Sequence, residues 1–309
     1  MSSPSRQMSG RFGLGLAYAL GANLVWGLSP IYFKLLSHVP AIEILAHRVL
    51  WSVPILLALS LVMKGGWRGV RAALGGRGRG PTYLLCTLLV SFNWGLFIWG
   101  VGAKRVMEVS LGYYISPLVM VVLALLFLRE RLSLLQQIAV GMAACGVAVL
   151  AIGAGTVPIV SFLLALSWST YALIRTKAGV DPLVGLLVET TMMAPVAATY
   201  LAWIHGNDGG AWGAAGLDQD LLLAAAGVVT VVPLMLFMNA TRHVAFSTVG
   251  LLGYLAPTLQ LLIAIVYGEP FTLWHGIAFA SIWSGLAVYS ADAWKRQRAR
   301  TQAALAAAE

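Results

Sequence analysis

Long apolar stretches separated by short polar segments run along the whole chain. Each is close to the roughly 20 residues that a helix needs to cross a bilayer. Ten such stretches lie at about 13–33, 41–63, 82–100, 108–128, 134–153, 157–174, 182–204, 221–240, 244–267 and 273–291. The connections between them leave no room for a soluble domain. This pattern predicts an all-α integral membrane protein with ten transmembrane helices.

The composition supports lipid as the solvent of this chain. Of 309 residues, 60% are hydrophobic and only 10% charged, against roughly 25% charged in an ordinary soluble domain. The net charge of +9 is better explained by basic residues at helix ends than by a nucleic-acid partner. Cys86 and Cys145 both fall in apolar segments, which indicates packing rather than a disulfide. No small-residue cleavage site follows the first apolar stretch, so we expect it to be retained as a helix.

The distribution of Lys and Arg predicts the orientation. If the N-terminus is cytoplasmic, 16 of the 20 basic residues lie in inside segments, including Arg175 and Lys177 after the sixth stretch. Three lie in outside segments, and Arg48 lies within the membrane. Such an asymmetry is the signature of cytoplasmic loops. The longest outside loop instead carries Asp208, Asp218 and Asp220. Ten spans then place both termini in the cytoplasm.

The chain also repeats itself. Leu96–Pro117 aligns without gaps on Leu236–Pro257, with identities at Leu96/Leu236, Phe97/Phe237, Leu111/Leu251, Tyr114/Tyr254 and Pro117/Pro257. An acidic turn then follows in each half, with Glu130 or Glu269, which we expect to pair with a nearby Arg. A repeat of five helices enters the membrane from the opposite face in its second copy. We therefore predict two inverted-topology five-helix repeats, 1–155 and 156–309, with a binding site between them near the midplane.

Several segments together resemble one family. They are EILAHRVLWS, NWGLFIWGV, LGYYISPL, LVET at Leu187–Thr190, and LLGYLAPTLQ followed by YGEPFT. These resemble the RarD proteins, which are known as chloramphenicol-sensitivity proteins, in the EamA group of the drug/metabolite transporter (DMT) superfamily. The resemblance covers nearly the whole chain. It implies a permease of the bacterial inner membrane that moves small organic metabolites, and it does not imply a particular substrate.

Ionisable side chains within apolar stretches are the first candidates for function, because charge at membrane depth is costly unless it is paired or faces a cavity. Glu43, His47 and Arg48 lie between Pro40 and Pro54. Arg48 is roughly 12 Å below the outer end of its span, and Glu189 is roughly 10 Å from the inner end of the seventh. Superposing Pro54 on Pro195 places Arg48 on Glu189. Two interpretations stay open: the two residues border the transport cavity, or they form an ion pair that locks the helices.

The cavity interpretation gives each charged residue a role. Arg48 presents a planar fork suited to a substrate carboxylate. Glu189 is a candidate to take up a coupling proton, because burial disfavours its charged form. His47 could relay that proton or only form a hydrogen bond with a neighbouring helix. Glu43 is about one turn inside the outer face, so we expect a gate or a solvated helix end there.

Uncharged residues complete the candidate cavity wall. They are Asn93, Trp94, Tyr113, Tyr114, Asn239, Tyr254 and Gln260. Pro117 and Pro257 are candidate hinges or ordinary packed kinks. Trp26 and Trp168, in equivalent spans, could stack on a substrate or pack in the bundle. Gly141, Cys145 and Ala148, and Ser281 and Gly285, have the small-residue spacing that allows close helix packing.

The leading hypothesis is a secondary transporter that works by alternating access. The sequence contains no phosphate-binding loop of the Walker type and no cluster with metal-ligand spacing, so we expect no enzyme activity, cofactor or metal. The candidate substrates are amino acids and chloramphenicol-like drugs, and we expect their transport to be coupled to protons or to occur by substrate exchange. Membrane lipid is the other partner, and the protein is expected to be a monomer or homodimer. The alternatives are an intramembrane enzyme with His47 and Glu189 as acid and base, or a receptor or regulatory protein without transport.

Overall fold

The structure is a computed structural model that describes residues 4–62, 80–103, 105–154, 159–207, 209–268 and 271–306. Outside these ranges lie Lys104, Asp208, Glu269 and the basic segment with Lys64, Arg68, Arg71, Arg77 and Arg79. Every regular element within them is a helix. The predicted all-α class is confirmed.

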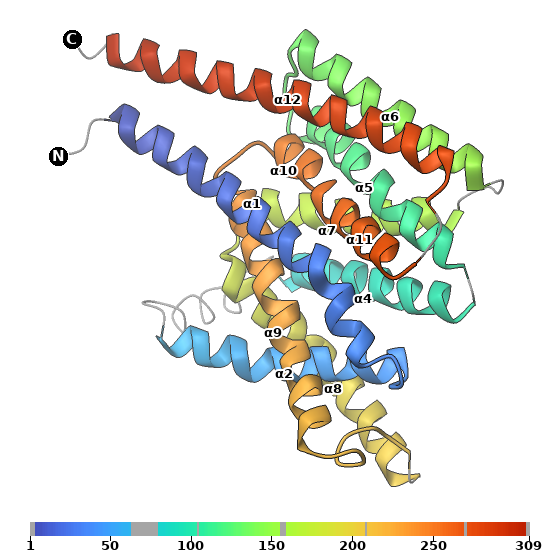
Figure 1. Cartoon of the computed structure of the whole chain (residues 1–309). Helices are drawn as coiled ribbons and strands as arrows, with labels where there is room; N and C mark the ends of the chain where they lie inside the picture. The colour runs from blue at the N-terminus through green and yellow to red at the C-terminus, as the bar shows by residue number, and fades with distance from the viewer. Residues whose placement is uncertain are drawn as a thin grey trace.

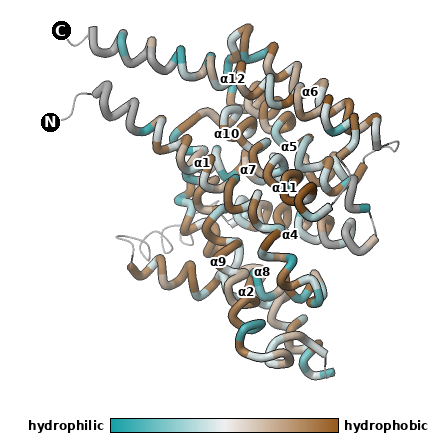
Figure 2. Tube along the Cα trace, in the orientation of Figure 1, coloured by the Kyte–Doolittle hydropathy of each residue, from teal (hydrophilic) through white to brown (hydrophobic). Residues whose placement is uncertain are grey.

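The helices follow the predicted spans closely. The first five spans form α1 (Pro4–Leu35), α2 (Ala41–Val62), α4 (Gly80–Gly102), α5 (Val106–Phe127) and α6 (Leu134–Ala154). The second five form α7 (Ile159–Ala178), α8 (Pro182–Gly206), α9 (Leu217–Ala240), the pair α10 (Phe246–Leu252) and α11 (Leu255–Val266), and α12 (Leu273–Ala306). Within the described residues, eight spans are long and apolar enough to cross a membrane, with α10 and α11 counted together. The other two predicted spans are α4 and α12, and apolar residues run along the helices (Figure 2).

The helix contacts have an internal symmetry. Helix α2 packs on α8, and α6 packs on α12. Helix α1 contacts α9 and α11, while α7 contacts α4 and α5 (Figure 1). Exchanging α1 with α7, α4 with α9, and α5 with α10–α11 converts one set of contacts into the other. This exchange is what inverted-topology repeats require, and both termini project from the same side of the bundle (Figure 1).

The two segments that align in sequence also meet in space. The Tyr114 hydroxyl donates to the carbonyl of Pro257 at 3.1 Å, so one Tyr-x-x-Pro motif binds the other. Gly250 and Gly253 face Pro117, and a side chain at Gly250 would press on the Pro117 carbonyl. Small residues in α10 therefore allow close approach to α5 at the centre of the bundle.

The two matched prolines lie in different local structures. Helix α5 runs unbroken through Pro117, whereas the corresponding span is divided at Gly253 and Tyr254, just before Pro257. Proline has no N–H, so in an unbroken helix Pro257 would leave the Gly253 carbonyl without its partner. A broken helix at membrane depth is tolerated where it is buried in protein, and Tyr254 is only 1% exposed.

Small residues bring α6 and α12 together, but not all of those predicted. The Ser281 hydroxyl donates to the Met142 carbonyl at 2.8 Å, and a side chain at Gly285 would overlap with the Ala139 carbonyl. On α6 the close contact is at Gly146, which faces Ala278. Gly141 faces open space and Cys145 is exposed. The predicted spacing therefore holds on α12, while α6 uses a different face.

Glu130 does not have the Arg partner that was expected of it within the described residues. Its carboxylate accepts the N–H of Phe246 at 2.8 Å and the hydroxyl of Ser247 at 2.5 Å. Phe246 and Ser247 begin α10 and are each 1% exposed. A buried helix N-terminus needs acceptors for its free N–H groups and favours negative charge, so Glu130 caps α10. The corresponding Glu269 lies outside the described residues.

Candidate functional site

Arg48 lies in the interior of the bundle, on α2, with its guanidinium held from several sides. Its Nε donates to the Thr230 hydroxyl on α9 at 2.9 Å. The guanidinium carbon lies 5.1 Å from the centre of the Trp94 ring and 5.7 Å from that of Phe33. No ion pair to Arg48 occurs within the described residues. Thr230 and the two rings therefore orient the fork, and its charge stays uncompensated.

The side chain of Arg48 remains accessible although residues of several helices surround it. This side chain is partly exposed although it lies in the interior of the helix bundle. Tyr113 has the same character, with 42% of its surface exposed at an interior position within electrostatic range of Arg48. The terminal nitrogens of Arg48 and the hydroxyl of Tyr113 make no hydrogen bond to other described residues, and the two Arg48 nitrogens are not enclosed by protein. We use the name Arg48 opening for the accessible region around the Arg48 guanidinium, whose neighbours are Phe33, Trp94, Tyr113 and Thr230.

Glu189 pairs with a different arginine from the one considered in the sequence. Its Oε1 lies 3.2 Å from Nε of Arg175, and its Oε2 accepts from the Tyr171 hydroxyl at 2.8 Å. Glu189 is 2% exposed and Arg175 4%. The interpretation that Arg48 and Glu189 form an ion pair that locks the helices is therefore wrong for the described structure, because Glu189 pairs with Arg175.

Arg175 was missed as a functional residue, since it was counted among the cytoplasmic helix ends. It lies three residues before the end of α7, and α8 begins at Pro182, so the tight turn directs it onto α8. Its guanidinium donates to the Pro182 carbonyl at 3.3 Å and lies against Gly185, where a methyl group would overlap with it. Glu189 itself could have indicated Arg175, because a buried carboxylate needs a partner. Arg175 lies one turn beyond Tyr171, so both side chains reach Glu189 from the same face of α7.

The two halves place corresponding residues together. Matching Trp26 to Trp168 on the first helix of each half also matches Phe33 to Arg175, and Arg48 corresponds to Glu189 on the second helix. In each half these two positions are in contact: Phe33 with Arg48, and Arg175 with Glu189. The second half therefore neutralises its charge internally, whereas the first half places an aromatic ring where the counter-charge would be.

An aromatic cluster lies beside the Glu189 site. The rings of Trp26 and Trp168 lie 5.6 Å apart edge to face, and Phe237 contacts both. Trp168 also lies 5.6 Å from Tyr171, which holds Glu189. Trp26 and Trp168 occupy corresponding positions, so their contact places them where the two halves meet. They pack on one another, and like Trp94 they are partly buried against the same two hydrophobic clusters of the bundle.

Glu43 and His47 lie in a second cluster under the connection from α8 to α9. Glu43 is 1% exposed and accepts the N–H of Ala211 at 2.5 Å, so the expected solvated helix end is wrong. The connection folds over α2 and buries the carboxylate, while His47 stacks on Trp212 at 5.3 Å. Nε2 of His47 lies 3.9 Å from Glu43 and has no hydrogen-bond partner within the described residues.

A cavity of about 350 Å³ lies beside His47 and is lined by both α2 and α8. His205 on α8 and Trp212 complete its wall. The Gln219 side chain holds the same connection from α9, by donating to the Ala211 carbonyl and by contacting His38 at 2.6 Å. Glu43 and Gln219 therefore fasten the α8–α9 connection over the C-terminal end of α1 and the N-terminal ends of α2 and α9.

The remaining predicted wall residues mostly join helices. Asn93 is buried and donates to the Leu164 carbonyl and the Ser167 hydroxyl, both at 2.9 Å. Gln260 donates to the Trp26 carbonyl at 3.0 Å, which links α11 to α1. Asn239 forms its hydrogen bond within α9, to the Met235 carbonyl. The Tyr254 hydroxyl is buried without a hydrogen-bond partner in the described part of the chain. Of these uncharged residues, Trp94 and Tyr113 are the two that face Arg48.

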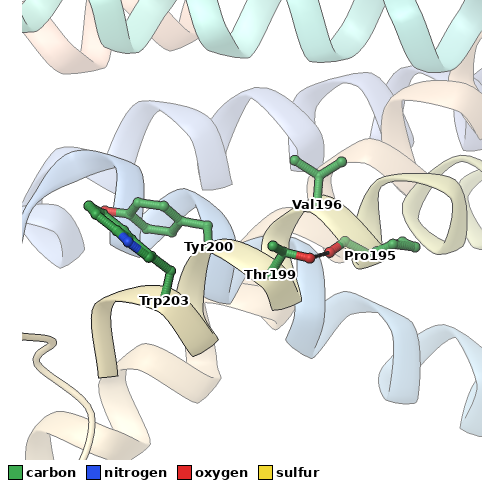
Figure 3. Close-up of a pocket in the computed structure, with 5 residues that line it drawn as sticks. All are labelled: Pro195, Val196, Thr199, Tyr200 and Trp203. Carbon is green, nitrogen blue, oxygen red and sulfur yellow. Dashed lines mark hydrogen bonds between the residues drawn. The ribbon is translucent and has the colours of Figure 1, made fainter. Parts of the chain in front are cut away.

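A larger depression of about 550 Å³ lies on α8 and has a different character (Figure 3). It is lined by Pro195, Val196, Thr199, Tyr200 and Trp203. Val196 is 75% exposed and Trp203 65%, and the Thr199 hydroxyl is satisfied by the Pro195 carbonyl at 2.8 Å. With no charged side chain in its lining, this depression belongs to the lipid-facing surface of α8. It is not a candidate substrate site.

Comparisons with known proteins agree with this architecture. Residues 13–152 match the EamA-like transporter family. An uncharacterized transporter of Vibrio cholerae is 43% identical over 94% of this chain and 96% of its own length. The protein RarD of Salmonella typhimurium is 42% identical over 92% of this chain and 97% of its own. The chain belongs to the EamA-like transporter family, in its RarD group.

Other relatives extend the picture within this family. A chloramphenicol-sensitive protein RarD of Pseudomonas aeruginosa is 33% identical over 88% of this chain and 91% of its own length. A solved crystal structure with 20% sequence identity superposes with a TM-score of 0.70, over 90% of this chain and 97% of that chain. At that identity the likeness shows the fold alone. The RarD relationship makes this chain a multi-pass membrane protein of a bacterial transporter family.

Proposed function

We propose that this RarD-group protein is a secondary active transporter that moves a small organic metabolite by alternating access. A negatively charged group of the substrate binds Arg48. The observation that carries this proposal is the state of the Arg48 guanidinium: Thr230 orients it, no described carboxylate pairs with it, and its terminal nitrogens face the Arg48 opening. A charge at this depth is normally paired or functional. A planar fork with free N–H groups is suited to bidentate binding of a carboxylate.

The proposal assigns coupling to the Glu43–His47 pair rather than to Glu189. The charge of Glu189 is compensated by Arg175, and its second oxygen is occupied by Tyr171. Within the described part of the chain, Glu43 has only a backbone N–H and a nearby imidazole as partners. Gain or loss of a proton there would change the hydrogen bond that fastens Ala211 and the outer connection. Proton coupling, or substrate exchange if no proton moves, is the mode that this arrangement supports.

The same contacts argue against an intramembrane enzyme. That alternative needs His47 and Glu189 to act together as acid and base. In the described structure His47 stacks on Trp212 near Glu43, whereas Glu189 is held by Arg175 and Tyr171. The two groups belong to separate clusters, so no acid–base pair is assembled.

Flux into proteoliposomes tests the proposal. Purified full-length protein is reconstituted, and uptake of amino acids, organic acids and chloramphenicol is measured with and without a proton gradient. We expect wild type to accumulate a substrate and Arg48→Leu to lose its flux. Glu43→Gln should still exchange that substrate but no longer concentrate it, and Glu189→Gln should retain concentrative uptake.

The controls separate folding from function in that experiment. Each variant is compared with wild type by size-exclusion chromatography before reconstitution. If Glu189→Gln loses concentrative uptake while Glu43→Gln keeps it, coupling belongs to Glu189 and the assignment to Glu43 is wrong. Unchanged flux in a folded Arg48→Leu variant would refute the substrate role of Arg48. If no compound moves under either condition, the transport proposal itself fails.

A further inference from the structure

We infer that the Arg48 opening selects organic monoanions with a flat apolar body over amino-acid zwitterions. This inference rests on the proposed transport function and names the substrate class of the same site. It depends on which groups surround Arg48 and on which groups are already engaged elsewhere.

Among the residues that the structure describes, the surroundings of Arg48 offer one positive charge and no acid. Thr230 contributes a hydroxyl, and Phe33 and Trp94 contribute ring faces. The sequence pattern groups two acids, Glu189 and Glu43, with Arg48, but both are engaged elsewhere. Glu189 is held by Arg175 and Tyr171, and Glu43 accepts the N–H of Ala211. A bound carboxylate would neutralise the guanidinium. The ammonium group of a zwitterion would lose its water without gaining a counter-charge.

Cation–π contacts do not replace the missing acid. Aromatic faces can hold an ammonium group, but the rings of Trp94 and Phe33 are already within 5.1 and 5.7 Å of the Arg48 guanidinium. A second cation over the same rings would be repelled by the first. The hydroxyl of Tyr32, also within electrostatic range of Arg48, donates to the Leu222 carbonyl at 2.6 Å. Its oxygen can still accept a hydrogen bond, but a neutral hydroxyl supplies no counter-charge to an ammonium group.

The remaining wall suits an apolar ring. Tyr113 is 42% exposed, and Phe97 packs against it with ring centres 6.2 Å apart. The Tyr113 hydroxyl, free of described partners, can donate a second hydrogen bond to a carboxylate at Arg48. Phe33 stands where the second half has Arg175, so the first half presents an aromatic surface at the position of a charge. These features fit a compact carboxylate attached to a flat hydrophobic body.

The experiment uses ligand pairs that differ only in the α-ammonium group. Binding of 3-phenylpropionate is compared with that of phenylalanine, and binding of indole-3-propionate with that of tryptophan, by calorimetry on the full chain in detergent. We expect each acid to bind wild type at least about tenfold more tightly than its amino acid. Arg48→Leu should lose the binding of the acids.

Thr230→Asp is the variant that sharpens the test, because it places a carboxylate where the hydroxyl now meets Nε of Arg48. We expect it to weaken acid binding by about tenfold or more and to reverse the preference toward the amino acids. Thr230→Asn is the matched neutral control and should keep the preference for acids. If Thr230→Asp does not fold, Phe33→Glu introduces the acid from α1 and serves the same purpose.

The outcomes separate the inference from the proposed function. If amino acids bind as tightly as the acids, or more tightly, and that binding still requires Arg48, the selectivity is wrong and the substrate role of Arg48 stands. If the variants with an added acid leave the preference unchanged, the charge balance at Arg48 does not set selectivity. If neither binding nor flux depends on Arg48, the proposed function fails together with the inference.

Discussion

Arg48 and Glu189 occupy corresponding positions in the two halves, yet one charge is left open and the other is enclosed. Glu189 is 2% exposed, pairs with Arg175 and accepts from Tyr171. Arg48 is partly exposed and has a hydroxyl and two rings around it. The difference arises on the neighbouring helix, where Phe33 in the first half corresponds to Arg175 in the second. A repeated fold thus gives one half a structural ion pair and leaves the other half a charge for a ligand.

The largest effect is expected from breaking the enclosed pair. Glu189→Leu or Arg175→Leu leaves the other charge buried without a partner, which costs about 3–5 kcal/mol. The double variant Arg175→Met with Glu189→Leu removes both charges and should recover most of that loss. Unfolding by denaturing detergent, followed by circular dichroism, measures the three free energies. Single variants as stable as wild type would show that the pair does not hold α7 to α8.

A smaller effect is expected at Gly185, where the guanidinium of Arg175 lies against the backbone of α8. Gly185→Ala forces the arginine to move, and overpacking of this kind costs about 1–3 kcal/mol. Gly141→Ala is the matched control, since Gly141 faces open space and alanine favours the helix. The same unfolding assay compares them. Equal stability of the two variants would mean that Arg175 can leave Gly185 without cost.

The smallest effect on stability is expected at Arg48. Arg48→Leu removes one hydrogen bond to Thr230 but breaks no described ion pair, so the stability should change by less than about 1.5 kcal/mol. Its effect on flux should instead be complete, which is the reverse of the behaviour expected for Arg175. A large loss of stability in Arg48→Leu would place this residue in the packing of the bundle and remove the contrast between the halves.

The contacts of Glu43 and Glu130 differ from those expected from the sequence, and the reason is the same for both. Glu43 was expected at a solvated end or gate and Glu130 beside an arginine, but both accept backbone N–H groups of distant segments, Ala211 and Phe246. The separation in sequence exceeds 100 residues in each case. Hydrophobic periodicity and charge describe positions along a single helix, so they could not identify the distant N–H groups that these two carboxylates accept.

Hydropathy, charge asymmetry and the internal repeat determined the spans, the inverted architecture and the family resemblance, because each is a property of consecutive residues. The alignment of the two Tyr-x-x-Pro motifs also identified segments that meet, at Tyr114 and Pro257. The sequence located the important charges as well, since an ionisable side chain at membrane depth is conspicuous. Their partners were decided only by the tertiary structure. The rotation of the helices and the tight turn after α7 direct Arg175 onto Glu189 and leave Arg48 facing the Arg48 opening. The depth of a residue within its span does not predict either of these features.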